Sequence, residues 1–197
     1  MHTTKARRPV PTRKFPQPKL LTYEDYARLT PLNSGNYELR NGKIEAMPSP
    51  IPSHQLISSE LHIALGGFIR QHRLGKFIAA PMDTQFTEHD TFQPDLLFVS
   101  NERLGIIGEK KIEGAPDLVV EILSPGNTPK EMSYKRHVYE STGVREYWFI
   151  EPEQRTLSQY ERVGDELRWQ RTLTPDDILR SAVVAGFEMG LGRIFEG

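Results

Sequence analysis

Three acidic residues interrupt apolar segments whose residue types predict buried strands. Asp95 precedes a Leu-Leu-Phe-Val run, Asp117 precedes Leu-Val-Val, and Glu121 lies inside Val-Val-Glu-Ile-Leu. An ionised carboxylate among such residues needs a cation, several hydrogen bonds or a shifted pKa, because burying an unpaired charge is costly. Glu121 is therefore the residue whose presence most demands a chemical explanation.

Strand geometry indicates which acid can share a small ligand with Glu121. Asp117 is four residues from Glu121, which is roughly 13 Å along a strand and too far for one ion. Asp95 and Glu121 can lie side by side if their strands pair, since neighbouring strands run about 4.8 Å apart. Two converging carboxylates form a hard oxygen site for Mg²⁺ or Mn²⁺, an ion that can polarise a phosphodiester and activate water. The sequence thus favours a metal site at Asp95 and Glu121.

A lysine follows on the next expected helix. Glu131, Lys135 and Tyr139 are spaced by four residues and so share one helix face. A lysine that reaches back toward the metal can orient the attacking water or offset charge on a phosphate. The alternative is an exposed Glu131–Lys135 pair, which stabilises a helix by only about 0.2–0.5 kcal/mol.

Two further residues are candidates for the same cleft. Glu38 lies in an expected hairpin strand and can supply an extra acid near the metal, or serve a structural purpose. His54 lies at an expected helix start and can contact a phosphate or water, or act as a cap or packing residue.

Several other classes of enzyme are excluded by missing motifs. The chain has no cysteine, which rules out disulfides, thiolate nucleophiles and Cys-ligated metal sites. The histidines lack the His-Glu-x-x-His spacing of zinc hydrolases, and no Gly-x-Ser-x-Gly elbow or Gly-Lys-Ser/Thr phosphate loop occurs.

The elements that must position these residues follow from periodicity and turn signals. Thr22 and Asp25 predict a helix start, and Asn41-Gly42 predicts a hairpin over 37–45. Ser53 predicts the cap of a helix that runs to about Arg73 and is closed by Gly75. The order of the elements predicts a mixed α/β domain around one sheet. Further along, the pattern predicts a helix over 129–139 capped by Thr128, and extended segments at 77–87, 96–99, 118–123, 146–150, 157–162, 166–173 and 183–187.

Charge is unevenly distributed along the 197 residues, whose net charge is −1. Residues 1–19 hold six basic residues, four prolines and no acid, so the remainder carries 19 basic and 26 acidic residues, or −7. We expect a flexible basic tail at 1–19 and a folded domain at 20–197. The acidic body argues against a broad phosphate-binding surface, although not against a local cleft. Without an apolar run of roughly 18–20 residues, we expect a soluble, cytoplasmic protein with no membrane partner.

Beyond these inferences, the chain resembles the Uma2 (DUF820) family of the PD-(D/E)XK nuclease superfamily over about residues 20–196. The resemblance implies a restriction-endonuclease-like mixed central sheet flanked by helices, with an added N-terminal helix and hairpin. It is carried by Pro94-Asp95, the run from Asp117 to Pro125, Glu131, Lys135, Tyr139, the run from Gly143 to Trp148, Tyr37-Glu38 to Gly42, Pro52-Ser53-His54 and Pro81-Met-Asp.

The resemblance assigns roles residue by residue. Asp95 matches the aspartate of the PD pair and Glu121 the second acid, whereas Leu123 occupies the place of the expected lysine. Lys135 on the following helix is implied as the replacement, one turn after Glu131, where the family usually carries aspartate.

The implied activity is Mg²⁺-dependent or Mn²⁺-dependent endonucleolytic hydrolysis of DNA, leaving a 5′-phosphate and a 3′-hydroxyl. Many nucleases of this superfamily are symmetric dimers, so a homodimer is expected. The competing hypothesis is a non-catalytic nucleic-acid-binding or assembly module that retains the fold. Leu123 and the acidic body favour this hypothesis.

Overall fold

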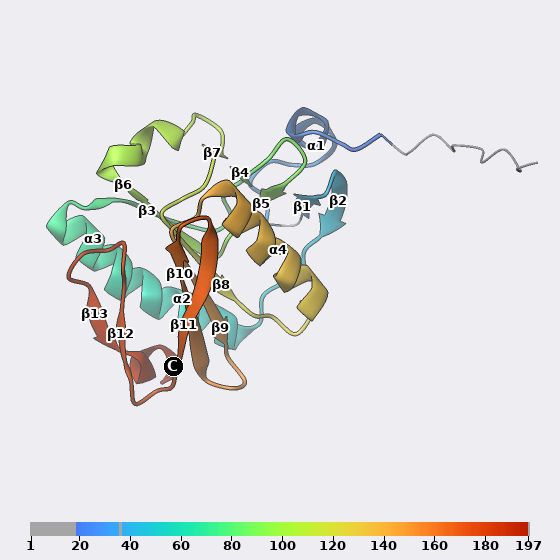
Figure 1. The fold of residues 1–197 in the computed structure, drawn as a ribbon. Coiled ribbons are helices and arrows are strands. Elements are labelled where there is room, and N and C mark those ends of the chain that lie inside the picture. Colours follow the sequence, from blue (N-terminus) through green and yellow to red (C-terminus); the bar gives the residue numbers. More distant parts are fainter. Residues whose placement is uncertain (1–18, 36, 197) are drawn as a thin grey trace, which may run out of the picture.

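The central strands of the chain form a six-stranded mixed sheet (Figure 1). The computed structural model describes residues 19–35 and 37–196, so the predicted basic tail lies outside the described residues except for Lys19. Strands β8 and β9 pair in parallel and the other pairs are antiparallel. The order across the sheet is β11 (Glu166–Leu173), β10 (Thr156–Val163), β9 (Glu146–Glu151), β8 (Leu118–Ile122), β6 (Leu96–Ser100) and β3 (Gly75–Ala79).

Helix α4 (Pro129–Thr142) connects the two parallel strands and covers one face of this sheet (Figure 1). Thr128 is its N-cap as predicted: the Thr128 Oγ accepts from the Glu131 N–H, and the Glu131 carboxylate accepts from the Thr128 N–H. The helix ends at Gly143, whose φ of 100° suits a residue without a side chain. Lys135 and Tyr139 are on the buried face of this helix.

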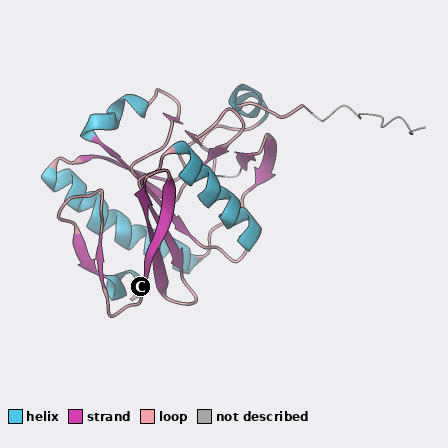
Figure 2. Ribbon diagram, in the orientation of Figure 1, coloured by secondary structure: helices cyan, strands magenta, loops and turns pink. Residues whose placement is uncertain are grey.

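A helix interrupted by a π-helical turn packs on the opposite face of the sheet (Figure 2). It consists of α2 (Pro52–Leu61), a π-helical turn over His62–Gly66, and α3 (Gly67–His72). Two predictions here were wrong: Ser53 makes no capping bond because Ile51 is the N-cap, and Arg73 rather than Gly75 takes the left-handed conformation, with φ of 54°. Apolar periodicity predicted the helix because Ile57, Leu61, Leu65 and Ile69 are all buried.

The predicted hairpin is confirmed, and it joins a second sheet. Asn41 and Gly42 both have positive φ, as a two-residue hairpin turn requires. The helix that Thr22 begins, α1 (Tyr23–Leu29), packs on this sheet. The strand order is β2 (Lys43–Ala46), β1 (Tyr37–Arg40), β5 (Thr91–Phe92), β4 (Thr84–Gln85) and β7 (Ile112–Glu113).

The C-terminal segment departs from prediction. Residues 183–187 form a turn rather than a strand, and they are apolar because Val184 and Phe187 pack into the core. Glu146 holds this turn, since its carboxylate accepts from the N–H groups of Ala182 and Val183. The remaining elements are η2 (Asn101–Ile106), β12 (Ile178–Arg180), β13 (Glu188–Gly190) and η3 (Leu191–Phe195). None of the helices in the described ranges is long and apolar enough to span a membrane.

Asp117 has a structural environment that yields a stability prediction. Its fully buried carboxylate accepts from Ser100 N–H at 2.7 Å, Arg145 at 3.0 Å and Arg103 at 3.2 Å. Burial alone would raise its pKa, but the Ser100 hydrogen bond and the two guanidinium groups outweigh burial and lower the pKa below 3.8. The ionised form therefore stabilises the fold at neutral pH, and this contribution is lost as the pH falls through the depressed pKa.

We expect Asp117→Asn to lower the free energy of unfolding by about 1–3 kcal/mol at pH 7. The difference from the parent should shrink below about pH 4. Urea unfolding of both proteins at pH 7 and pH 3 measures it, and a difference independent of pH would contradict the assignment.

Candidate active site

The pairing of β6 with β8 brings two of the predicted acids together. Leu96 pairs with Val120 in antiparallel register, so the next positions outward are Asp95 and Glu121. Both side chains line a cleft of about 320 Å³ at this end of the sheet, which His54 on α2 also lines. Asp117 lies at the other end of β8, as its separation along the strand predicted.

Lys135 of α4 lies directly against the central acid. Its Nζ is 3.0 Å from Glu121 Oε1 and 2.9 Å from Glu38 Oε1, and its side chain is 4% exposed. Tyr139, one turn later, donates a short hydrogen bond from its hydroxyl to the same Glu121 oxygen. The alternative of an exposed Glu131–Lys135 pair is therefore wrong, because Lys135 is buried between two carboxylates.

The electrostatics of this group follow from burial. Burial raises the pKa of Glu121 to about 7, and the Lys135 ammonium, which favours the carboxylate, only partly offsets it. For Lys135, burial favours the neutral amine, but Glu121 and Glu38 outweigh burial and raise its pKa above the ordinary range. Lys135 is thus an ammonium at neutral pH, with two of its three N–H donors directed at carboxylates.

Asp95 has a histidine as its partner. His54 Nε2 lies 3.1 Å from one carboxylate oxygen, and the other oxygen accepts from Ile122 N–H at 2.7 Å. Burial lowers the pKa of His54, yet the neighbouring Asp95 and Glu121 raise it overall. His54 Nδ1 is buried and has no hydrogen-bond partner among the described residues.

Glu38 and Glu131 serve as supports for the cleft. Glu38 is 1% exposed and outside the set of residues that line the cleft; its Oε1 also accepts from Gln93 N–H at 2.9 Å. Arg40 links the two acids, since its guanidinium reaches both Glu38 and Glu131. Four of the predicted residues therefore line the cleft: Asp95, Glu121, Lys135 and His54. The other three, Glu38, Glu131 and Tyr139, support them from outside the cleft lining.

Gln93 was not among the residues predicted from the sequence. This residue nevertheless lines the same cleft, and its amide oxygen is a possible metal ligand. Its Nε2 donates to Asp83 Oδ1 at 2.6 Å, so the amide oxygen of Gln93 points away from Asp83. Asp83 is fixed as an acceptor by Tyr26 O–H and Asn33 N–H. Gln93 Oε1 is left buried and without a partner in the described part of the chain, although Gln93 lines the cleft. A glutamine before Pro94 carries no sequence signal for this arrangement.

The donor set fits a hard divalent cation. No cluster of three or more acidic or histidine side chains arranged to hold a metal occurs within residues 19–35 and 37–196. The cleft instead offers two carboxylates, Asp95 and Glu121, and the unpartnered amide oxygen of Gln93. Carboxylate and amide oxygens are the ligands that Mg²⁺ and Mn²⁺ prefer, with water completing the coordination.

Comparison with solved structures supports the same fold. The chain is similar to a protein from Anabaena variabilis ATCC 29413 described as a putative nuclease belonging to DUF820. The TM-score is 0.73 at 21% sequence identity, covering 89% of this chain and 97% of the other. The chain matches no curated protein.

The family is shown by the sequence itself. The model described as Uma2, putative restriction endonuclease, matches residues 23–192 and so includes every element that forms the cleft. The chain therefore belongs to the Uma2 family.

Proposed function

We propose that this protein is a metal-dependent endonuclease that hydrolyses phosphodiester bonds of DNA. The observation that carries the proposal is the Lys135 ammonium 3.0 Å from Glu121, beside Asp95 in an open cleft. Paired carboxylates with an adjacent buried ammonium provide both a cation site and a donor for a phosphate oxygen. The Uma2 family and the nuclease-like fold support this reading.

The proposed reaction assigns a task to each residue. Asp95 and Glu121 would hold Mg²⁺ or Mn²⁺, which supplies a water of lowered pKa and charge neutralisation at the phosphate. Lys135 directs its third N–H toward a non-bridging phosphate oxygen and steadies the charge that develops there. Water adds to phosphorus, the bond from phosphorus to the 3′ oxygen breaks, and the products are a 5′-phosphate and a 3′-hydroxyl. Glu38 and Tyr139 position Lys135 and Glu121, while His54 positions Asp95 through its Nε2.

Plasmid nicking tests the proposal. Purified protein is incubated with supercoiled plasmid and Mg²⁺ or Mn²⁺, with EDTA and Asp95→Asn as controls. We expect nicking that both controls abolish. No cleavage of plasmid, linear, single-stranded or RNA substrates would instead support the non-catalytic module. Nicking that survives Asp95→Asn would exclude this cleft as the catalytic site.

The proposed cation site makes Gln93 testable without cleavage. Gln93→Leu removes the unpartnered amide oxygen at similar volume, so we expect Mn²⁺ to bind about 10-fold to 100-fold more weakly. Isothermal titration or the electron paramagnetic resonance of free Mn²⁺ measures the affinity. The control is Gln55→Leu, an exposed glutamine on the rim of the same cleft, which should leave Mn²⁺ affinity unchanged. Equal affinities for all three proteins would remove Gln93 from the cation site.

A further inference from the structure

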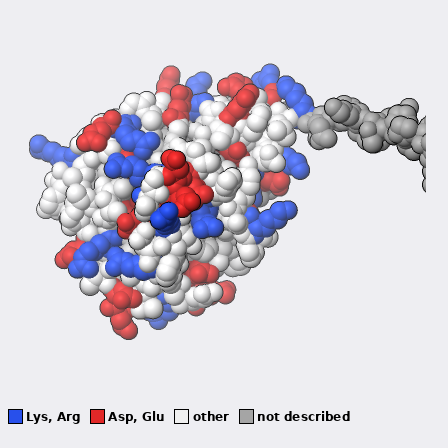
Figure 3. All heavy atoms as spheres, viewed as in Figure 1, with Lys and Arg blue, Asp and Glu red and all other residues white. Residues whose placement is uncertain are grey.

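One stretch of the chain is basic although the body as a whole is acidic. No acidic residue occurs between Glu60 and Asp83, whereas Arg70, Arg73 and Lys76 all lie there. These residues belong to α3, the turn after it and β3, which pack against each other. On the face of the molecule drawn in Figure 3, acidic and basic side chains are interspersed. The positive charge of this stretch is therefore local.

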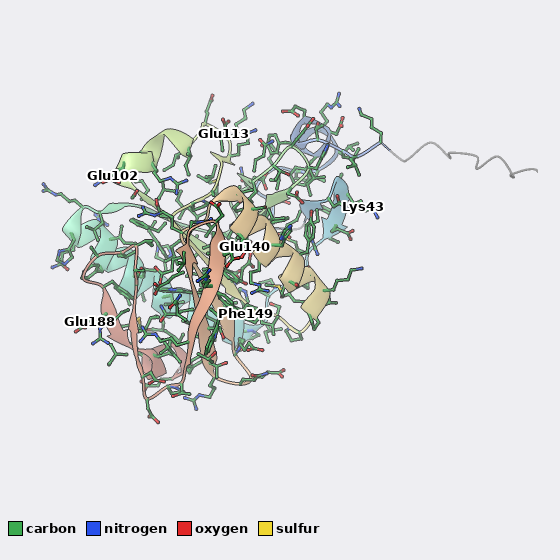
Figure 4. All side chains as sticks on the ribbon, viewed as in Figure 1. Lys43, Glu102, Glu113, Glu140, Phe149 and Glu188 are labelled. Atoms are coloured by element: carbon green, nitrogen blue, oxygen red, sulfur yellow. The ribbon has the colours of Figure 1, made fainter. Side chains whose placement is uncertain are left out.

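The stretch borders a groove of about 710 Å³ between α3 and β3. We call it the α3–β3 groove. Its lining includes Arg70, Arg73 and Lys76, together with the Phe77 ring, and no acidic residue. Glu102, labelled in Figure 4, lies on η2 beside the groove residue Asn101 but outside the lining.

The three cations have no carboxylate partners. All three are exposed, and none forms an ion pair within residues 19–35 and 37–196. Arg103 and Arg145, by contrast, both form ion pairs with Asp117. Unpaired guanidinium and ammonium groups around a groove without acids favour a ligand that carries several negative charges.

The position of the groove relative to the cleft indicates which ligand. The groove and the cleft lie along the same two segments of chain: His54 on α2, which the π-helical turn joins to α3, and Ala80, directly after β3, both line the cleft. Lys76 precedes Ala80 by four residues, or about 13 Å along a strand. Arg70 follows His54 by sixteen residues, or about 24 Å along a helix. Phosphates of one DNA strand are spaced by about 3.4 Å along the duplex axis, so the interval corresponds to about four to seven nucleotides.

We propose that the α3–β3 groove binds backbone phosphates of the DNA about four to seven nucleotides from the cleavage point. This inference rests on the proposed function, since it takes DNA as the substrate of the cleft. The groove supplies affinity and register rather than chemistry, because phosphate contacts position a protein on DNA without reading sequence. It also explains how a chain with a net charge of −1 can hold a polyanion, through a local rather than a general basic surface.

Binding measured in EDTA tests the groove separately from cleavage. The groove variant is Arg70→Gln/Arg73→Gln/Lys76→Gln, and its control is Lys43→Gln/Lys110→Gln/Lys130→Gln, three exposed lysines outside the groove. Both variants change the net charge equally. Fluorescence anisotropy then gives the affinity of each protein for a labelled 30-base-pair duplex over a range of salt concentrations.

We expect the groove variant alone to bind the duplex at least about tenfold more weakly, with a salt slope smaller by roughly 3. An equal loss in both variants, or an unchanged affinity of the groove variant, would overturn the proposal.

A second ligand separates a DNA site from a site for small anions. If inorganic tripolyphosphate binds the parent but not the groove variant, while the parent binds no DNA, the groove is a small-anion site and the proposal fails. If the parent cleaves plasmid and the groove variant binds DNA normally, the groove proposal fails while the proposed function stands. If the groove variant loses DNA binding but the parent never cleaves, the groove proposal stands and the proposed catalysis fails.

Discussion

Replacing Glu121 with glutamine is expected to reduce metal-dependent cleavage of DNA at least about 100-fold while the protein stays folded. Loss of a group that only supports a metal ligand already costs up to about 100-fold, so loss of a proposed ligand should cost no less. Glutamine keeps the shape of the side chain and an oxygen that accepts from Lys135 and Tyr139. Plasmid nicking rates at fixed Mn²⁺ measure the effect.

The same substitution, Glu121→Gln, is expected to leave the stability of the folded protein unchanged or to raise it. Burial raises the pKa of Glu121 to about 7, so above that pH the folded protein holds a desolvated carboxylate that the unfolded chain would solvate. Removing this charge should leave the melting temperature at pH 8 unchanged or higher, as is usual for destabilising groups in active sites. Glu161→Gln, a strand carboxylate outside the cleft, is the control and should nick normally. Unfolded Glu121→Gln protein, or nicking at the parental rate, would contradict the assigned role.

Replacing Lys135 with methionine is expected to harm both stability and cleavage. Glu38 and Glu121 are 1% and 5% exposed and share this one ammonium, so its removal leaves two buried carboxylates without their common cation. Breaking a buried ion pair from one side costs about 3–5 kcal/mol. Cleavage should fall about 10²-fold to 10³-fold, the range for losing one group that stabilises developing charge. Urea unfolding and nicking rates measure the two effects.

A double variant separates these effects. Glu38→Gln/Lys135→Met removes one of the stranded carboxylates, so the free energy of unfolding should recover part of the loss seen with Lys135→Met alone. Cleavage should not recover, because the donor to the phosphate is still missing. A double variant that regains cleavage would make Lys135 a structural residue.

The acids on regular strands were the predictable part of the site. Asp95 and Glu121 each stand out because an acid in a run of valines and leucines is energetically expensive, and strand pairing then brings them together. Lys135 and Tyr139 follow from helical spacing. The α/β fold, the hairpin and the α4 cap follow equally from patterning and turn residues.

The contacts between distant segments were not predictable. Glu38 reaches Lys135 only because the hairpin joins a second sheet, whose docking no local pattern specifies. Gln93 is an ordinary polar residue until Asp83 fixes its amide. The π-helical turn at His62–Gly66 interrupts a periodicity that looks continuous, and the buried turn at 183–187 has the apolar composition of a strand. A homodimer, the cytoplasmic location and the flexible tail stay predictions.

The Glu38–Lys135–Glu121 contact has a consequence for the order of folding. It joins β1 near the start of the chain to β8 and α4 more than eighty residues later, and it links two different sheets. Contacts of such long range form late, because the loop between them must close first. The small sheet has short strands and can open locally at a lower cost than the whole molecule. A nascent or partly unfolded chain therefore lacks the Glu38–Lys135–Glu121 contact, so any nuclease activity arises only when folding is complete.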